Sequence, residues 1–146
     1  MQWTYNGKKI TKIPDEYEGF VYLITNKTTG QKYIGKKLAK FKTTKPPLKG
    51  KKNKRRGYKE SDWKTYYGSQ TDIKQLLVKG KKDEFERTIL KCVETKKQLT
   101  YFEIKYQMLY QVLEKPDEFF NDNILGKFFT KDLNGIVFED LVDTTI

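Results

Sequence analysis

The apolar and polar positions between residues 20 and 36 predict a β-hairpin. Residues 20–25 form an apolar, β-branched run that is typical of a strand, and residues 31–36 return as its partner. Residues 26–30 supply the turn between them. Because side chains alternate between the two faces of a strand, only a fixed register places Tyr22 and Tyr33 side by side. The hairpin therefore brings two phenols onto one small sheet.

Periodicity predicts two more elements downstream. A short helix over residues 72–79 has three apolar residues on one side, with Ser69 or Thr71 as its cap and Gly80 as its stop. Apolar and polar residues alternate over residues 85–93, which indicates a third strand.

The clearest helix spans residues 96–114, where an apolar stripe recurs at helical spacing. Thr95 and Gln98 match a capping box at its start, and Pro116 is expected to end it. Farther along, residues 135–138 are expected to pack as a last strand.

Glu103 interrupts the apolar stripe of this helix, one residue after Phe102 and three before Tyr106. An unpaired buried charge costs several kcal/mol, so the carboxylate either sits in water or is held for a purpose. Two interpretations stay open: an ion pair with Lys36 or Lys37, or a metal ligand.

The charge of the chain is uneven. The net charge is +11, and no acidic residue occurs between Glu18 and Glu60. Residues 36–59 hold twelve Lys or Arg, and such self-repulsion, together with Pro46-Pro47, predicts a loop or mobile arm. Lysine far outnumbers arginine in the chain, so contacts to phosphates are expected more than readout of bases. The predicted nucleic-acid-binding residues are Lys36, Lys40, Lys49, Lys51, Lys52, Lys54, Arg55, Arg56 and Lys64.

The residue types that the chain lacks restrict the reactions that it can catalyse. It has no histidine, which excludes Ser-His and Cys-His hydrolases and leaves acid-base work to Tyr, Lys, Asp or Glu. Its one cysteine, Cys92, lies among apolar residues and is expected to be a buried thiol. No apolar run approaches the roughly 18 residues of a membrane span, and the first residues lack a signal region. We therefore expect a cytoplasmic protein without membrane contact.

Several short strings resemble those of the GIY-YIG nuclease family. The match begins with Gly19-Phe20-Val21-Tyr22, Asn26-Lys27 and Gly30, and continues with Lys32-Tyr33-Ile34-Gly35-Lys36-Lys37. The run Tyr66-Tyr67-Gly68-Ser69 resembles a bacteriophage and intron-encoded subgroup that carries an insertion here. The resemblance implies an α+β fold, a small three-stranded antiparallel sheet flanked by helices. Residues 1–146 would form one such domain, with a basic insertion at 36–60 and a short acidic extension at 132–146.

The resemblance also implies a set of roles. Family members cut nucleic-acid phosphodiesters with one divalent metal, Mg²⁺ or Mn²⁺, and Glu103 matches the only protein ligand. Tyr22 matches the residue that acts as general base or positions the water, and Tyr33 matches the support for water and phosphate. Gly35 would let the backbone approach the substrate. Asn121, or alternatively Asn123, would steady the site.

One family feature has no counterpart. The expected arginine on the first helix is missing, so Lys37, Lys36, Arg55, Arg56 or Lys64 is expected to stabilise the phosphate, with Lys37 following the second motif directly. Adjacent lysines and a metal-bound water are expected to favour the deprotonated form of a catalytic tyrosine or to let it relay a proton.

Charge and resemblance together predict a metal-dependent DNA endonuclease, encoded by a bacteriophage and acting in the bacterial cytoplasm as a monomer or weak homodimer. A basic nucleic-acid-binding protein that does not cleave, on the same scaffold, is the chief rival. A ribosome-associated or RNA-packing protein would account for the charge but would leave the two tyrosine motifs unexplained.

Overall fold

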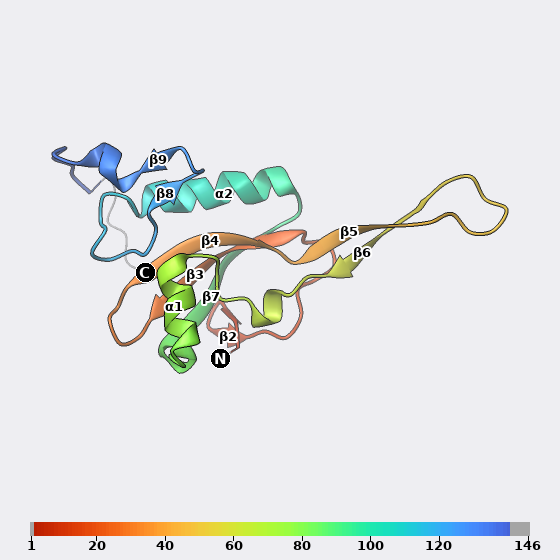
Figure 1. Cartoon of the computed structure of the whole chain (residues 1–146), viewed down its shortest axis with the longest axis horizontal. Coiled ribbons are helices and arrows are strands. Elements are labelled where there is room, and N and C mark those ends of the chain that lie inside the picture. The colour runs from red at the N-terminus through yellow and green to blue at the C-terminus, as the bar shows by residue number, and fades with distance from the viewer. Residues whose placement is uncertain (1, 141–146) are drawn as a thin grey trace.

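The structure, a computed structural model, describes residues 2–140 and contains the predicted hairpin. Strand β3 (Gly19–Asn26) pairs antiparallel with β4 (Lys32–Leu38), which runs two residues farther than the pattern indicated. Asn26 organises the turn, because its side-chain oxygen accepts from the backbone N–H groups of Thr28 and Thr29. Figure 1 shows the hairpin at the centre of the fold, flanked by both helices.

The sheet has five strands in the order β2-β1-β7-β3-β4. Strand β7 (Phe85–Val93) lies where alternation predicted it and pairs antiparallel with β3. The short β1 (Thr4–Tyr5) adds parallel to β7, and β2 (Lys8–Lys9) follows β1. The expected three-stranded antiparallel sheet was therefore too small, and the α+β sheet is mixed.

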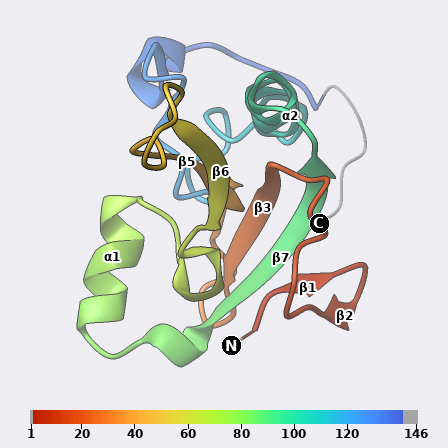
Figure 2. The same cartoon turned by 90° about the vertical axis from the view of Figure 1, so that its right-hand side faces the viewer.

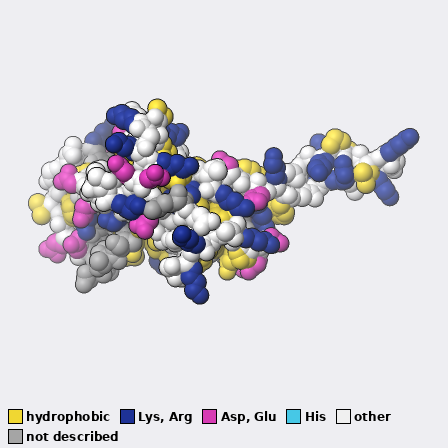
Figure 3. Space-filling view, turned by 90° about the horizontal axis from the view of Figure 1, so that it is seen from below, with side chains coloured by type: hydrophobic (Ala, Val, Ile, Leu, Met, Phe, Trp, Pro, Cys, Tyr) yellow, Lys and Arg dark blue, Asp and Glu magenta, His cyan; other side chains and the backbone are white. Residues whose placement is uncertain are grey.

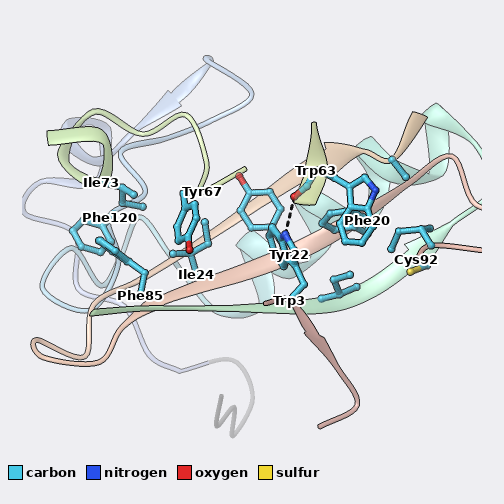
Figure 4. Close-up of a cluster of buried hydrophobic side chains, with 13 residues drawn as sticks. Trp3, Phe20, Tyr22, Ile24, Trp63, Tyr67, Ile73, Phe85, Cys92 and Phe120 are labelled. Atoms are coloured by element: carbon cyan, nitrogen blue, oxygen red, sulfur yellow. Dashed lines mark hydrogen bonds between the residues drawn. The ribbon is translucent and has the colours of Figure 1, made fainter. Parts of the chain in front are cut away.

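Trp3 explains the additional strands. Its side chain is only 1% exposed, and its indole N–H donates to the Trp63 carbonyl oxygen at 2.7 Å. Burying a large indole with its donor satisfied fixes the N-terminal segment against the edge of β7. Figure 4 shows this hydrogen bond within the aromatic cluster around Phe20 and Tyr22.

Strand β3 separates two hydrophobic cores. Its even-numbered side chains, such as Phe20, pack in the aromatic core with Ile73 of α1 (Thr71–Val78). Its odd-numbered side chains, such as Val21, pack with Leu99 of α2 (Lys96–Leu109). The two helices lie on opposite sides of the sheet (Figure 2). A central strand buried on both faces explains the continuous apolar run in the sequence.

Helix α1 is capped differently from the expectation. Gln70, not Ser69 or Thr71, accepts from the backbone N–H of Ile73 at 2.9 Å. The longer glutamine side chain reaches the first turn while it also donates to the Phe120 carbonyl. Gly80 follows the helix with a φ of 79°, which confirms it as the stop.

Helix α2 begins as predicted and ends earlier. Thr95 accepts from the backbone N–H of Gln98 at 3.1 Å. The helix ends at Leu109, because Gln111 has a φ of 53°. The backbone N–H groups of Gln111 and Val112 then bond back to the last helical carbonyls. Pro116 lies beyond this end and does not cause it.

The basic insertion is a β-ribbon and not a loop. Strands β5 (Lys40–Lys45) and β6 (Arg55–Glu60) pair antiparallel, so only residues 46–54 are irregular. Phe41, Thr43 and Thr44 in β5 and Tyr58 in β6 favour extended backbone, and this preference outweighs the repulsion among the lysines. Figure 1 shows the β5–β6 ribbon, residues 40–60, projecting from the body.

The C-terminal region is mostly irregular. It contains β8 (Asn123–Ile124), β9 (Phe128–Phe129) and the 3₁₀ turn η3 (Thr130–Leu133). The strand predicted at 135–138 does not form: these residues belong to none of the sheets within residues 2–140, and Val137 is 95% exposed. Part of the proposed acidic extension, residues 141–146, lies outside the described residues. No helix among residues 2–140 combines the length and apolar character that a membrane span requires.

Cys92 is buried in the aromatic core, as its apolar surroundings predicted. Burial raises the pKa of its thiol to about 11. The side chain is therefore a neutral packing group at physiological pH.

Arg87 of β7 is a buried cation that holds the segment after the ribbon. Its guanidinium donates to the carbonyl oxygens of Lys64 and Tyr66 at 3.0 and 2.9 Å. It also lies 4.8 Å from the Trp3 ring centre and 4.1 Å from that of Tyr67. This segment includes the 3₁₀ turn η1 (Trp63–Thr65), while η2 (Lys82–Glu84) leads into β7.

We expect Arg87→Met to destabilise the fold by about 2–4 kcal/mol, because a buried cation is removed and two partly buried carbonyls lose their donor. Urea unfolding followed by tryptophan fluorescence measures this. The matched control is Arg56→Met on the exposed ribbon, which should change stability by no more than about 0.5 kcal/mol. Equal stability of the two variants would contradict the anchoring role.

Candidate active site

The register of the hairpin brings the two motif tyrosines together. Tyr22 lies directly opposite Gly35, and Tyr33 lies two residues away on the same face of β4. Their ring centres are 6.2 Å apart. A Cβ atom at Gly35 would lie 2.5 Å from the Tyr22 hydroxyl oxygen and 2.8 Å from Tyr33 Cε1. The glycine therefore makes room for the phenol pair, which is a packing reason for its place in the motif.

A third tyrosine joins this pair. The Tyr66 side chain hydrogen-bonds with that of Tyr22, and their ring centres are 5.9 Å apart. Gly68, at a φ of 89°, lies beside this pair, and a Cβ atom there would lie 3.4 Å from the Tyr22 hydroxyl oxygen. Ser69 then hydrogen-bonds with Tyr33. Sequence reasoning gave Tyr66 no catalytic role and predicted only that it could pack on the sugars or bases of a nucleic acid, although its Tyr-Tyr-Gly-Ser run was noticed.

Burial sets the protonation of these phenols. Tyr22 is 1% exposed, and burial first, then the neighbouring Tyr33, raises its pKa well above 10. Burial, followed by the charge of Glu103, raises the pKa of Tyr33 to about 12. Desolvation and a nearby carboxylate outweigh the lysines, so the lysines alone do not favour a deprotonated phenol. The expected effect of a metal-bound water and the expected proton relay stay predictions.

A polar cavity of about 520 Å³ opens beside β4. It brings together Tyr33, Lys36 and Glu103, which the sequence singled out, with Asn123. Gln107, Ser69 and Asp122 also line it, and sequence reasoning gave them no site role. A polar residue one helical turn after Glu103 was the available signal for Gln107. The other predicted catalytic residues do not line the cavity: Tyr22, Gly35, Lys37 and Asn121.

Glu103 is held by one residue of β4. Its carboxylate accepts from the Lys36 backbone N–H, and the Lys36 ammonium lies 3.9 Å from Glu103 Oε1. The same ammonium donates to Thr100 Oγ1 at 2.9 Å. Burial raises the pKa of Glu103 above its ordinary value, and Lys36 offsets part of that shift. The structure thus contains the ion pair that the sequence offered as one interpretation. No group of three or more His, Cys, Asp or Glu side chains that could hold a metal occurs within residues 2–140.

Asn121 hydrogen-bonds with the backbone of β4 at the outer edge of the sheet. Its side-chain oxygen accepts from the Ile34 N–H at 3.0 Å, and its amide donates to the Ile34 carbonyl at 2.8 Å. Gln107 donates to the same carbonyl at 2.9 Å. Asn121 is 4% exposed and replaces a neighbouring strand at this position. Asn123, the alternative candidate, lies at the rim of the cavity.

The remaining candidate cations point elsewhere. The Lys37 ammonium donates to Asp62 Oδ1 at 2.6 Å and lies 4.3 Å from the Tyr66 ring centre. It therefore faces the aromatic side of the sheet, opposite to Lys36. Lys64 pairs with Glu60 at 3.3 Å. Arg55 and Arg56 lie on β6, and the other predicted nucleic-acid contacts also lie on the ribbon or in its tip: Lys40, Lys49, Lys51, Lys52 and Lys54.

Comparison with known proteins gives one match. A family model described as "Putative endonuclease segE, GIY-YIG domain" matches residues 3–124, which is most of the chain. The matched range includes the hairpin, the ribbon, and all of α2. No curated protein and no solved structure matches the chain.

We expect Gly35→Ala to destabilise the fold by about 1–3 kcal/mol, because the added methyl group overlaps both phenols. Urea unfolding gives the change in free energy. The control is Gly57→Ala on the ribbon, where the nearest atom to the new methyl is Thr43 Oγ1 at 3.5 Å. That variant should stay within about 0.5 kcal/mol of the parent. If Gly35→Ala were equally neutral, the tight fit around the phenols would be wrong.

Proposed function

The chain belongs to the GIY-YIG endonuclease family, and we propose that it hydrolyses DNA phosphodiester bonds at the cavity beside β4 with the help of one divalent metal. The observation that carries the proposal is the meeting of Glu103, Lys36 and Tyr33 in one polar cavity. Together they offer an anionic ligand, a cation for phosphate and a hydroxyl group for water.

Glu103 would hold the metal. Its side chain is 15% exposed and is the more buried carboxylate of the cavity, whereas Asp122 lies exposed at the rim. A magnesium-type ion keeps several of its waters and needs only one or two carboxylates, which suits a polar cavity with a single enclosed acid. When bound, such an ion neutralises charge that develops on the phosphate and lowers the pKa of bound water.

The other residues would orient the reactants. Tyr33, with a pKa of about 12, keeps its proton at neutral pH and can hold a water or a phosphate oxygen by hydrogen bonding. Lys36 lines the cavity, and its side chain can move so that the ammonium contacts a substrate phosphate in place of Glu103. Tyr22 is buried behind Tyr33 and fixes its position through packing. We therefore assign the water-facing hydroxyl to Tyr33 rather than to Tyr22.

A DNA-binding protein that does not cleave is the second candidate. The ion pair between Lys36 and Glu103 favours it, because that ammonium can neutralise the carboxylate without a metal. The two candidates differ in whether Mg²⁺ binds and whether DNA is cut.

We expect Glu103→Gln to lower the cleavage rate of supercoiled plasmid by about 10³-fold or more, as for a loss of several kcal/mol of charge stabilisation. Affinity for DNA, measured in EDTA, should stay within about twofold because the lysines are unchanged. Near-normal cleavage by the variant would show that Glu103 is not the metal ligand.

Thermal unfolding tests the same residue without catalysis. The folded pKa of Glu103 is raised, so its contribution to stability is greatest at low pH and is lost as pH rises through that pKa. At pH 7 without metal, Glu103→Gln should therefore melt no lower than the parent. Mg²⁺ should raise the melting temperature of the parent alone. An equal shift of both proteins would place metal binding elsewhere, and no shift would favour the second candidate.

The hydroxyl groups of the two tyrosines can be compared directly. Tyr33→Phe should lower the rate at saturating DNA by roughly 10²-fold or more, because a group that contacts water or phosphate is lost. Tyr22→Phe is the matched control, since it deletes an identical hydroxyl that lies outside the cavity, and it should cost clearly less. The reverse order would assign the water to Tyr22.

A further inference from the structure

The β5–β6 ribbon stands free of the body. Every residue of β6 is exposed, and β5 has no buried residue. A two-stranded ribbon with no packed face has only marginal stability by itself in water. Packing in a hydrophobic core therefore does not explain why this ribbon is present. Figure 3 shows Lys and Arg side chains along the ribbon and at its tip, with no acidic side chain visible beyond its base.

Both faces of the ribbon are basic. Paired residues of an antiparallel ribbon share a face, and the register alternates between the two. One face has Lys40, Lys42 and Arg56, and the other has Lys45, Arg55 and Lys59. A ribbon that lay flat on one phosphate strand would need cations on one face only. Cations on both faces fit a site with phosphates on both sides.

We propose that the ribbon enters the major groove of duplex DNA edge-on, with each face toward one phosphate strand. This inference rests on the proposed function, in which DNA is the substrate. In this orientation the thickness of the ribbon across its two faces must fit between the phosphate strands. Sheets pack about 10 Å apart face to face, and the major groove is about 12 Å wide, so it accepts the ribbon with its side chains. The minor groove, about 6 Å wide, would have to be opened first.

The chain path links this contact to the cavity. Strand β4, which carries Tyr33 and Lys36, is separated from β5 by Ala39 alone. At about 3.3 Å per residue, the six residues of β5 span roughly 20 Å, which is less than one turn of DNA. The ribbon therefore contacts DNA to one side of the cavity and fixes the direction in which the duplex crosses it.

The first test compares the two faces of the ribbon. Lys42→Gln with Arg56→Gln removes two charges from one face, and Lys45→Gln with Lys59→Gln removes two from the other. The control is Lys8→Gln with Lys9→Gln on β2, which makes the same change in net charge. The salt dependence of affinity for an uncut duplex is measured in EDTA. Each ribbon variant should reduce the slope of log affinity against log salt by about 1.8, and the control should reduce it far less.

A reduced slope in only one ribbon variant would overturn the edge-on placement, because a single face would then carry the contacts. An unchanged slope in both would remove the ribbon from the interface. Since no cleavage is measured, these results stand apart from the proposed function. If both ribbon variants show reduced slopes but the protein never cuts DNA, the placement of the ribbon in the groove would stand and the proposed endonuclease activity would be rejected.

The second test distinguishes the grooves. Methylation of guanine N7 crowds the major groove, whereas netropsin fills the minor groove. Affinity for the N7-methylated duplex should fall about tenfold, and the variant with a shortened ribbon, in which residues 44–56 are replaced by Asn-Gly, should lose this sensitivity. Netropsin should change affinity by less than about twofold. Sensitivity to netropsin without sensitivity to N7 methylation would overturn the proposal in favour of the minor groove.

Discussion

The exposed edge of β4 is the constraint on which the site depends. The sheet ends at this strand, so the outward backbone groups of alternate residues need partners from elsewhere. Residues 118–120 pair with Lys32, the Asn121 side chain pairs with Ile34, and the Glu103 carboxylate accepts from Lys36. Each partner lies far along the chain from β4. Satisfying one edge therefore brings the second helix and the segment after it around a single cavity.

The same arrangement makes an enclosed carboxylate tolerable. Desolvation raises the pKa of Glu103, and the N–H and ammonium of Lys36 offset part of this cost. The phenols have no comparable cation within the cavity that overcomes their burial, and the pKa of Tyr33 rises to about 12. The site thus combines a carboxylate whose desolvation Lys36 offsets in part with a Tyr33 hydroxyl group that keeps its proton at neutral pH. A neutral phenol of this kind can donate a hydrogen bond to a water molecule or a phosphate oxygen.

The sequence predicted the parts of the fold that depend on local pattern. The hairpin, β7 and the start of α2 follow from alternation and capping, and Glu103 was found because it breaks an apolar stripe. Errors arose where distant residues decide. The β1 strand, for example, depends on a hydrogen bond from Trp3 to Trp63. The early end of α2 is a local exception, because it comes from the left-handed backbone of Gln111, two residues after the helix. Tyr66 and Gln107 enter the site only through packing between elements, which periodicity along the chain does not reveal.

Hydrogen bonds stabilise the base of the ribbon, whereas repulsion between like charges destabilises its outer half. At the base, the Ser61 backbone N–H and hydroxyl group donate to the Ala39 and Leu38 carbonyls, and these bonds close the ribbon against the body. Farther out, Lys45 and Arg55 lie directly opposite each other, an arrangement of like charges that destabilises a strand pair. A polyanion between or beside these cations would remove the repulsion that the free protein carries. A bound polyanion would therefore stabilise the paired ribbon, because it would offset the repulsion between these like charges.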